Sequence, residues 1–272
     1  MIDRTGRLLG LAALLWLVAL PAAFAVEIAP HRALYSLTLA STKSSSGVIG
    51  ANGAMIYEWG ETCEGWTVQQ RFRLRLQYAE QDSVEVSSSL VTWEAKDGLR
   101  YRFNERRLRN REPDEEIKGE AKLDGPGKGG TAEFTRPEAA RLTLAPGVLF
   151  PTAHTLLLIE RAQAGDQFFS REVFDGATVE NAGQITAVIG PKLKPGPSAG
   201  ETKLPDSPLL ARPSWRVRLA FFPSGSKAEQ PDYELGMRLL DNGVSQDMSL
   251  DYSDYVIHAT LDQIEALPRP SC

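Results

Sequence analysis

The residue pattern closest to a known catalytic motif in this chain is a serine between glycines. Residues Gly196–Gly200 have the form G-x-S-x-G around Ser198, and His258 follows with several aspartates between. This is the order of an α/β-hydrolase triad, whose serine lies on a sharp turn between a strand and a helix. Prolines surround Ser198 on both sides, with Pro195 and Pro197 nearest. They favour a loop, so a hydrolase is the weakest of our hypotheses.

Other residue types with chemical potential are scattered. Glu58, Glu61 and Glu64 could serve a glycosidase only if two carboxyls stood about 5 Å apart in a cleft, which their spacing does not indicate. The glycine-rich segment around Lys128 lacks the spacing of a phosphate-binding loop. The three histidines lie on separate segments without metal-ligand spacing: His31, His154 and His258. The sequence therefore predicts no catalytic residue, no metal site and no cofactor.

One segment is markedly basic. Six arginines fall within twelve residues, interleaved with Tyr101 and Phe103: Arg100, Arg102, Arg106, Arg107, Arg109 and Arg111. Such a run can bind phosphate or an acidic partner, which for an exported protein means a lipid or lipopolysaccharide headgroup. The alternative is a solvated strand face, because an acidic run follows at once: Glu105, Asp114, Glu115 and Glu116. We favour the solvated face and keep the first five arginines as a candidate anionic-ligand patch.

The composition limits the classes of function. The chain has 272 residues, of which 42% are hydrophobic and 24% charged, and its formal net charge is −5. These are values of a globular protein rather than a disordered one. A net negative charge argues against a nucleic-acid-binding protein.

The N-terminus indicates export. Arg4 and Arg7 precede an apolar segment from Leu8 to Leu20, and Ala23-Phe24-Ala25 follows Pro21. This is the pattern of a secretory signal peptide cleaved after Ala25. The alternative is an uncleaved anchor, but the apolar segment is shorter than the roughly 20 residues that span a bilayer. We expect residues 1–25 to be removed, leaving a soluble periplasmic protein that does not span the membrane.

The two cysteines, Cys63 and Cys272, both lie in the mature part. Because the compartment is oxidising and only one intramolecular pairing exists, we predict a single long-range disulfide. Two free thiols remain the alternative. A catalytic thiol lacks support, because there is no C-x-x-C and no histidine nearby.

Period-2 alternation dominates the mature chain and predicts strands. Between residues 66 and 78, one face is apolar except for Gln70, and the other is polar. Asp241-Asn242-Gly243 is typical of a hairpin turn. Further strands are expected at these ranges: 31–40, 49–59, 82–96, 99–104, 115–123, 131–135, 140–145, 167–181, 183–190, 214–222, 232–241, 244–252 and 254–263.

One stretch instead has helix signals, with Pro151 near its start and Gly165 at its end. We therefore predict an all-β fold: a single antiparallel barrel or spiral of a dozen or more strands, occupying residues 26–272, with one internal helix at about 151–164. An outer-membrane barrel also alternates, but the helix, the proline-rich loop after Pro191 and the non-strand tail argue against it.

Several phrases together are similar to a known family. They are His31-Arg32-Ala33-x-Tyr35-x-Leu37, Cys63-x-Gly65-Trp66, Phe150-Pro151-Thr152-x-His154-Thr155, Asp251-Tyr252-x-Asp254-Tyr255 and the terminal Cys272. In this order the chain resembles the cell-envelope integrity protein EipB family of alphaproteobacteria over nearly its whole mature length. The resemblance implies a periplasmic β-spiral, a disulfide between Cys63 and Cys272, and a role in envelope maintenance under stress without catalysis.

These observations favour a non-enzymatic periplasmic protein that supports the cell envelope by binding a partner protein, a peptide or a lipid. The alternative is a carrier of lipid or lipoprotein acyl chains, because the implied fold is similar to that of periplasmic lipoprotein carriers. Fold alone does not decide between them.

Overall fold

The computed structural model describes residues 26–197, 204–225 and 229–272. The signal peptide expected at residues 1–25 and the serine motif at Ser198 lie outside these residues. Fourteen strands and one α-helix, α1 (Pro151–Ala164), make up most of the described chain. The strands are β1 (His31–Thr42), β2 (Val48–Glu61), β3 (Gly65–Tyr78), β4 (Val84–Ala95), β5 (Arg100–Arg109), β6 (Glu112–Leu123), β7 (Gly130–Arg136), β8 (Ala140–Leu144), β9 (Phe168–Val173), β10 (Gly183–Leu193), β11 (Ser214–Phe222), β12 (Tyr233–Leu240), β13 (Ser245–Asp251) and β14 (Tyr255–Ala266).

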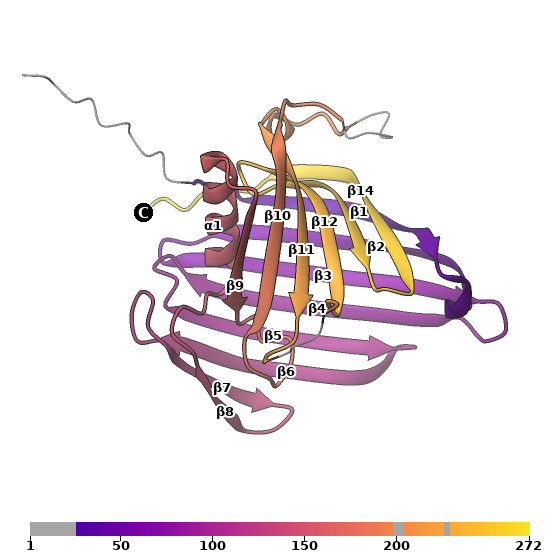
Figure 1. Ribbon diagram of the computed structural model, residues 1–272, viewed down its shortest axis with the longest axis horizontal. Helices are drawn as coiled ribbons and strands as arrows, with labels where there is room; N and C mark the ends of the chain where they lie inside the picture. The colour runs from indigo at the N-terminus through magenta and orange to yellow at the C-terminus, as the bar shows by residue number, and fades with distance from the viewer. Residues whose placement is uncertain (1–25, 198–203, 226–228) are drawn as a thin grey trace, which may run out of the picture.

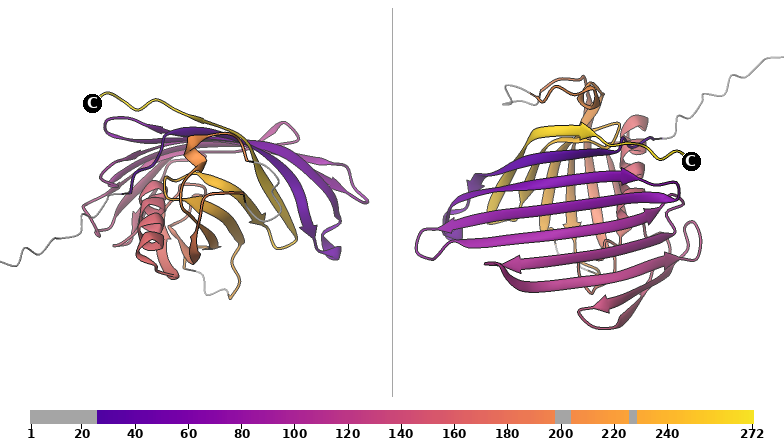
Figure 2. Two further views of the ribbon diagram at one scale, coloured as in Figure 1. Left: turned by 90° about the horizontal axis from the view of Figure 1, so that it is seen from above. Right: turned by 180° about the vertical axis from the view of Figure 1, so that it is seen from behind.

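All fourteen strands belong to one antiparallel sheet. Its order is β8-β7-β6-β5-β4-β3-β2-β1-β14-β13-β12-β11-β10-β9, so neighbours in the sheet are neighbours in sequence except where β1 pairs with β14. Figure 1 shows β9–β13 lying in front of the longer strands of the first half. Seen from above, the first half arches over the second (Figure 2). The predicted all-β spiral with one helix is confirmed.

The two outer strands of the sheet, β8 and β9, do not pair with each other. The chain between β8 and α1 contacts β9 through one parallel bridge, Leu149 to Val173. Helix α1 then packs on β9 and β10. The helix and this bridge cover the edge of β9, where unpaired N–H and C=O groups would otherwise meet water or another chain.

Each strand forms because its apolar side chains recur on one face. On β3, Leu74 and Leu76 are almost fully buried, whereas Arg73 and Arg75, which alternate with them, are exposed. The inner faces of the two halves meet around three groups of buried apolar side chains. Burial of apolar surface between the two halves therefore drives the spiral.

Two sequence-based boundaries were wrong. The strand expected at 167–181 ends at Val173, because the segment after it turns at Gly176, whose φ is +68°. In the other direction, the strand expected at 99–104 continues to Arg109 as β5. The hairpin expected at Asp241–Gly243 is present: Gly243 has a φ of +85°, and Leu240 N–H donates to the Val244 carbonyl.

The C-terminal tail is fastened back onto the start of the domain. Cys272 is joined to Cys63, in the turn between β2 and β3, by a disulfide that spans 209 residues. Leu267 N–H donates to the Pro30 carbonyl, and the Arg269 guanidinium forms ion pairs with Glu27 and Glu61. A tail rich in proline is thereby held along the outside of the sheet.

We predict that the variant with both cysteines replaced by serine loses about 2–5 kcal/mol in free energy of unfolding, because a cross-link over so long a segment restricts the unfolded chain most. Urea denaturation with and without reductant measures this. The double variant should be insensitive to reductant. Equal stability of the oxidised and reduced native chain would contradict the prediction.

Candidate functional site

Two hollows lie along the inner face of β3, one on each side of Gln70. One, which we call the helix-side hollow, has a volume of about 220 Å³ and lies against α1. The other, the tyrosine-side hollow, has about 260 Å³ and reaches Leu250 and Tyr252 at the end of β13. Gln70 lines both. The hollows follow β3, with Val68 on the helix side of Gln70 and Phe72 on the tyrosine side.

Their walls differ in chemistry. The helix-side hollow has the apolar side chains of Trp59, Val68 and Leu90. The tyrosine-side hollow includes charged residues from β5 and β6, among them Glu105 and Asp114. The interior is therefore apolar toward α1 and polar toward Tyr252.

Helix α1 is positioned by a buried carboxylate. Glu94 is 2% exposed, and its two oxygens accept hydrogen bonds from the N–H groups of Thr152 (2.7 Å) and Ala153 (2.8 Å). The residue before the helix, Phe150, has no capping side chain. Glu94 therefore supplies from β4 the acceptors that a helix N-terminus requires.

Burial raises the pKa of Glu94 to about 7, although the two N–H donors oppose the shift. The removal of water from a carboxylate outweighs its hydrogen bonds here. The residue is consequently protonated in part at neutral pH.

The segment after β9 closes the interior from the other side. Tyr101 O–H donates to the Asp175 carbonyl at 2.9 Å, and Arg107 donates to the Ala177 carbonyl at 2.9 Å. Gly176 is required between them, because a Cβ there would lie 2.6 Å from the Phe103 ring. Burial raises the pKa of Asp175. Two inward side chains of β5 thus tie the first half of the sheet to the second.

The candidate anionic-ligand patch does not form one surface. The alternation of β5 sends Arg100, Arg102 and Arg106 to the outside and Arg107 to the interior, where its guanidinium pairs with Glu105 (2.8 Å). Arg107 also forms an ion pair with Glu115 at 2.7 Å. Arg109, at the end of the strand, is exposed.

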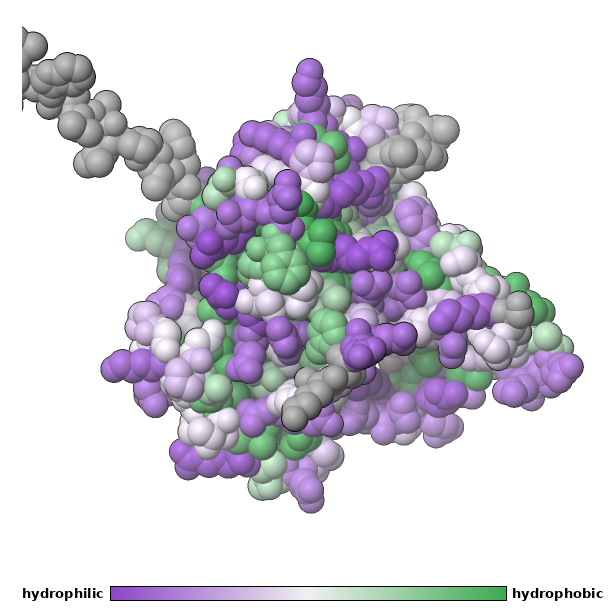
Figure 3. All heavy atoms as spheres, viewed as in Figure 1, coloured by the Kyte–Doolittle hydropathy of each residue, from purple (hydrophilic) through white to green (hydrophobic). Residues whose placement is uncertain are grey.

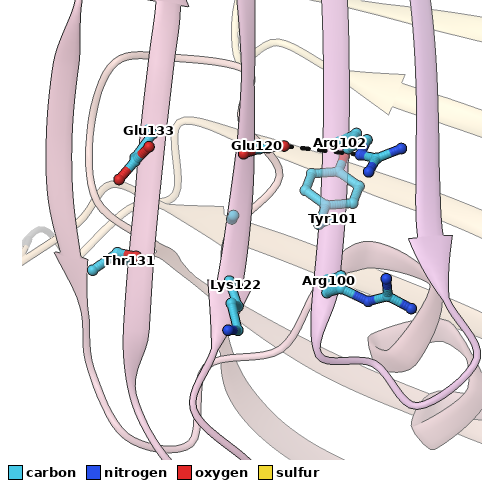
Figure 4. Close-up of a pocket in the computed structure, with 8 residues that line it drawn as sticks. Arg100, Tyr101, Arg102, Glu120, Lys122, Thr131 and Glu133 are labelled. Carbon is cyan, nitrogen blue, oxygen red and sulfur yellow. Dashed lines mark ion pairs between the residues drawn. The ribbon is translucent and has the colours of Figure 1, made fainter.

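The outer arginines lie beside carboxylates and an aromatic ring. Arg106 forms an ion pair with Glu116 at 3.2 Å, and Arg102 lies 3.8 Å from Glu120 (Figure 4). The guanidinium carbons of Arg100 and Arg102 lie over the Trp93 ring at 5.4 and 5.3 Å. Arg102 and Arg106 thus have the acidic neighbours that a solvated strand face requires, and the anionic-ligand patch stays a prediction.

The other candidate residues are also apart. Glu58 pairs with Arg32, and Glu61 pairs with Lys96 and Arg269. Burial lowers the pKa of His154 to about 4 and also lowers that of His31. Among the residues that the structure describes, no group of three or more His, Cys, Asp or Glu side chains is placed to hold a metal. In the same residues, no helix is long and apolar enough to cross a bilayer.

The comparisons with known proteins agree with this architecture. The profile of the EipB-like family matches residues 22–268. The chain belongs to the EipB-like family. A relative from Brucella abortus (strain 2308), named cell envelope integrity protein EipB, is 32% identical over 249 residues, which cover 91% of this chain and 87% of the relative. A crystal structure from Brucella abortus, described as a β-barrel-like protein of the domain of unknown function DUF1849, has a TM-score of 0.81 and 31% identity, and the match covers 90% of this chain and 100% of that one.

Membership of the EipB-like family supports a role in cell-envelope integrity for this chain.

The sequence did not reveal the roles of Glu94 and Asp175. Glu94 positions α1, and Asp175 lies in the wall of the helix-side hollow. The alternation of β4 carried one signal, because Glu94 falls on the same face as Leu90 and the buried Thr92. An acidic residue at an inward position needs a partner, and here the partner is the helix N-terminus.

Glu94 makes the stability of the EipB-like domain depend on pH. An unfolded glutamate has a pKa near 4.3, so between about pH 4.3 and 7 the folded state binds more protons, and the free energy of unfolding falls as pH rises, by up to about 3 kcal/mol. The variant Glu94→Gln should lose this part of the pH dependence. Urea denaturation at pH 5 and pH 8 measures it, and the exposed Glu120→Gln serves as the control. His154 acts in the opposite direction in both chains and cancels in the comparison. Equal pH dependence in the Glu94→Gln variant and the native chain would contradict the prediction.

Proposed function

We propose that this chain is a non-catalytic binding protein of the periplasm and that it supports the envelope by holding a ligand between the two halves of its sheet. The two hollows on either side of Gln70 carry this proposal, because they are concave, lie inside a domain held by a disulfide, and mix apolar walls with a few polar groups. Residues 1–25 would be the signal peptide and residues 26–272 the single exported domain.

The export pattern, the disulfide between Cys63 and Cys272, and the kinship with an envelope integrity protein support the periplasmic location. The ion pairs of Glu58 with Arg32 and of Glu61 with Lys96 favour a structural role for these carboxylates over glycoside hydrolysis. The partner would be a periplasmic protein segment, a peptide or a lipid, and not a nucleic acid.

A carrier of lipid or lipoprotein acyl chains is the second candidate. The apolar wall of the helix-side hollow, formed by Trp59, Val68 and Leu90, favours it. Such a carrier would show hydrocarbon-bearing molecules in the hollows of the purified protein, whereas a peptide-binding protein would show polypeptide.

A substitution that fills the tyrosine-side hollow tests the proposal. Ser88 lines this hollow, and its neighbour Ser89 lies on the outer face of β4, opposite Arg71 and Arg106. We expect Ser88→Trp to remove material that co-purifies with the protein, as seen by native mass spectrometry, and to fail to restore detergent resistance in a deletion strain. Ser89→Trp, with the same added ring outside, should behave as the native chain in both assays.

Both variants should retain native circular dichroism, because the new ring of Ser88→Trp enters existing space rather than a close-packed core. Full restoration of detergent resistance by folded Ser88→Trp would contradict the proposed function.

A further inference from the structure

We propose that Gln70 binds the main chain of an extended peptide whose side chains enter the two hollows, an apolar one toward α1 and a basic one toward Tyr252. This inference rests on the proposed function and names the class of ligand for the same site. It concerns one residue that the rest of the fold leaves without a role. Gln70 is the polar interruption on the otherwise apolar inner face of β3.

The side-chain amide of Gln70 is available to a ligand. No other described residue forms a hydrogen bond with it, and the side chain is only partly buried. A glutamine amide offers one acceptor and two donors, which match the C=O and N–H of a peptide group. The Gln70 amide atoms are not among the buried polar atoms that lack a partner, so water reaches them in the empty protein, and a peptide group would replace that water.

Thr155 and Asp175 of the helix-side hollow, by contrast, already have partners. Thr155 O–H donates to the Pro151 carbonyl, and the Asp175 carboxylate accepts from Ala177 N–H. One exception lies close by: Trp59 Nε1, in a residue only 4% exposed, has no hydrogen-bond partner among the described residues. This nitrogen is itself buried, so the argument for a peptide rests on the Gln70 amide.

The size and spacing of the hollows suit side chains. Each is smaller than the roughly 300 Å³ at the lower end of common small-molecule pockets. They lie on opposite sides of Gln70 along β3, beside Val68 and Phe72, which are four residues apart. Peptides that lie along strands place alternate side chains in such pockets while their main chain forms hydrogen bonds.

The charge of the tyrosine-side hollow selects a basic side chain. Its cation, Arg107, is already paired with Glu105 and Glu115. Asp114, which lines the same hollow, has no ion pair with any described residue. The hollow therefore keeps an uncompensated negative charge, and a lysine or arginine of the ligand would balance it.

The test uses two seven-residue peptides with blocked ends, Gly-Leu-Gly-Ser-Gly-Lys-Gly and its reverse-order partner Gly-Lys-Gly-Ser-Gly-Leu-Gly, because the direction of the chain is open. Leucine and lysine are four residues apart in both, as Val68 and Phe72 are in β3. Binding to the full mature chain is followed by NMR titration. We expect one order to bind saturably and its Lys→Glu version to bind at least tenfold more weakly. A version in which an ester replaces the amide before or after serine reports on the hydrogen bond to the main chain.

Gln70→Leu keeps the approximate size of the side chain and removes its hydrogen bonds. It should weaken binding of the amide peptide about tenfold and that of the best-matched ester peptide much less. Gln69→Leu, on the outer face of β3, is the control and should leave binding unchanged.

Failure of both peptide orders to bind saturably would overturn the inference, as would equal losses for amide and ester peptides in Gln70→Leu. Lipid found in the hollows of a protein that binds neither peptide would also overturn it while leaving the proposed binding function intact. Failure of Ser88→Trp to alter envelope protection would instead count against the proposed function itself.

Discussion

The hydrogen bonds that the Glu94 carboxylate accepts from the first N–H groups of α1 position the helix that forms one wall of the interior. A sheet of fourteen antiparallel strands that spirals without closing leaves a gap between its end strands, and α1 stands at that gap. The first N–H groups of the helix need acceptors, and Glu94 of β4, in the first half of the sheet, accepts hydrogen bonds from two of them. Because Pro151, Thr152 and Thr155 of the same helix line the helix-side hollow, the position of α1 sets the shape of that hollow.

Other contacts of the domain stabilise this arrangement. Tyr101 and Arg107 of β5 hold the segment after β9 against the first half of the sheet, and the disulfide between Cys63 and Cys272 fixes the tail on the outside. The outer face is different in character. On β5 and β6 it carries paired charges. Over β9 and β10, Figure 3 shows hydrophobic residues among polar ones. Phe168 and Val188 are exposed there and lie opposite each other in the sheet. Arg100 and Arg102 also line two outer hollows, of about 290 and 400 Å³, whose walls carry several charged side chains. The two interior hollows differ from these because apolar walls surround a few polar groups.

The strands were predictable because the two faces of each strand differ in polarity, as on β3, and the helix was predictable from Pro151 and Gly165. The register and the pairing of β1 with β14 were not, because alternation specifies which face is buried but not which strand lies beside it. The same alternation places Arg106 and Arg107 on opposite faces of β5. The number of arginines in the sequence therefore overestimated how many of them share one surface. Glu94 was missed because its partners, two N–H groups of a helix some sixty residues away, are main-chain atoms that no residue type reveals. Gln70 was visible as an irregularity, but its meaning depends on hollows that only the packing of both halves creates.

The most direct measurement is a crystal structure of the chain isolated without detergent from the cells that produce it. The account predicts continuous electron density that runs through both hollows and touches the Gln70 amide. Isolated ordered waters in both hollows, with α1 in the same place, would contradict the claim that the inside of this spiral is where the protein binds.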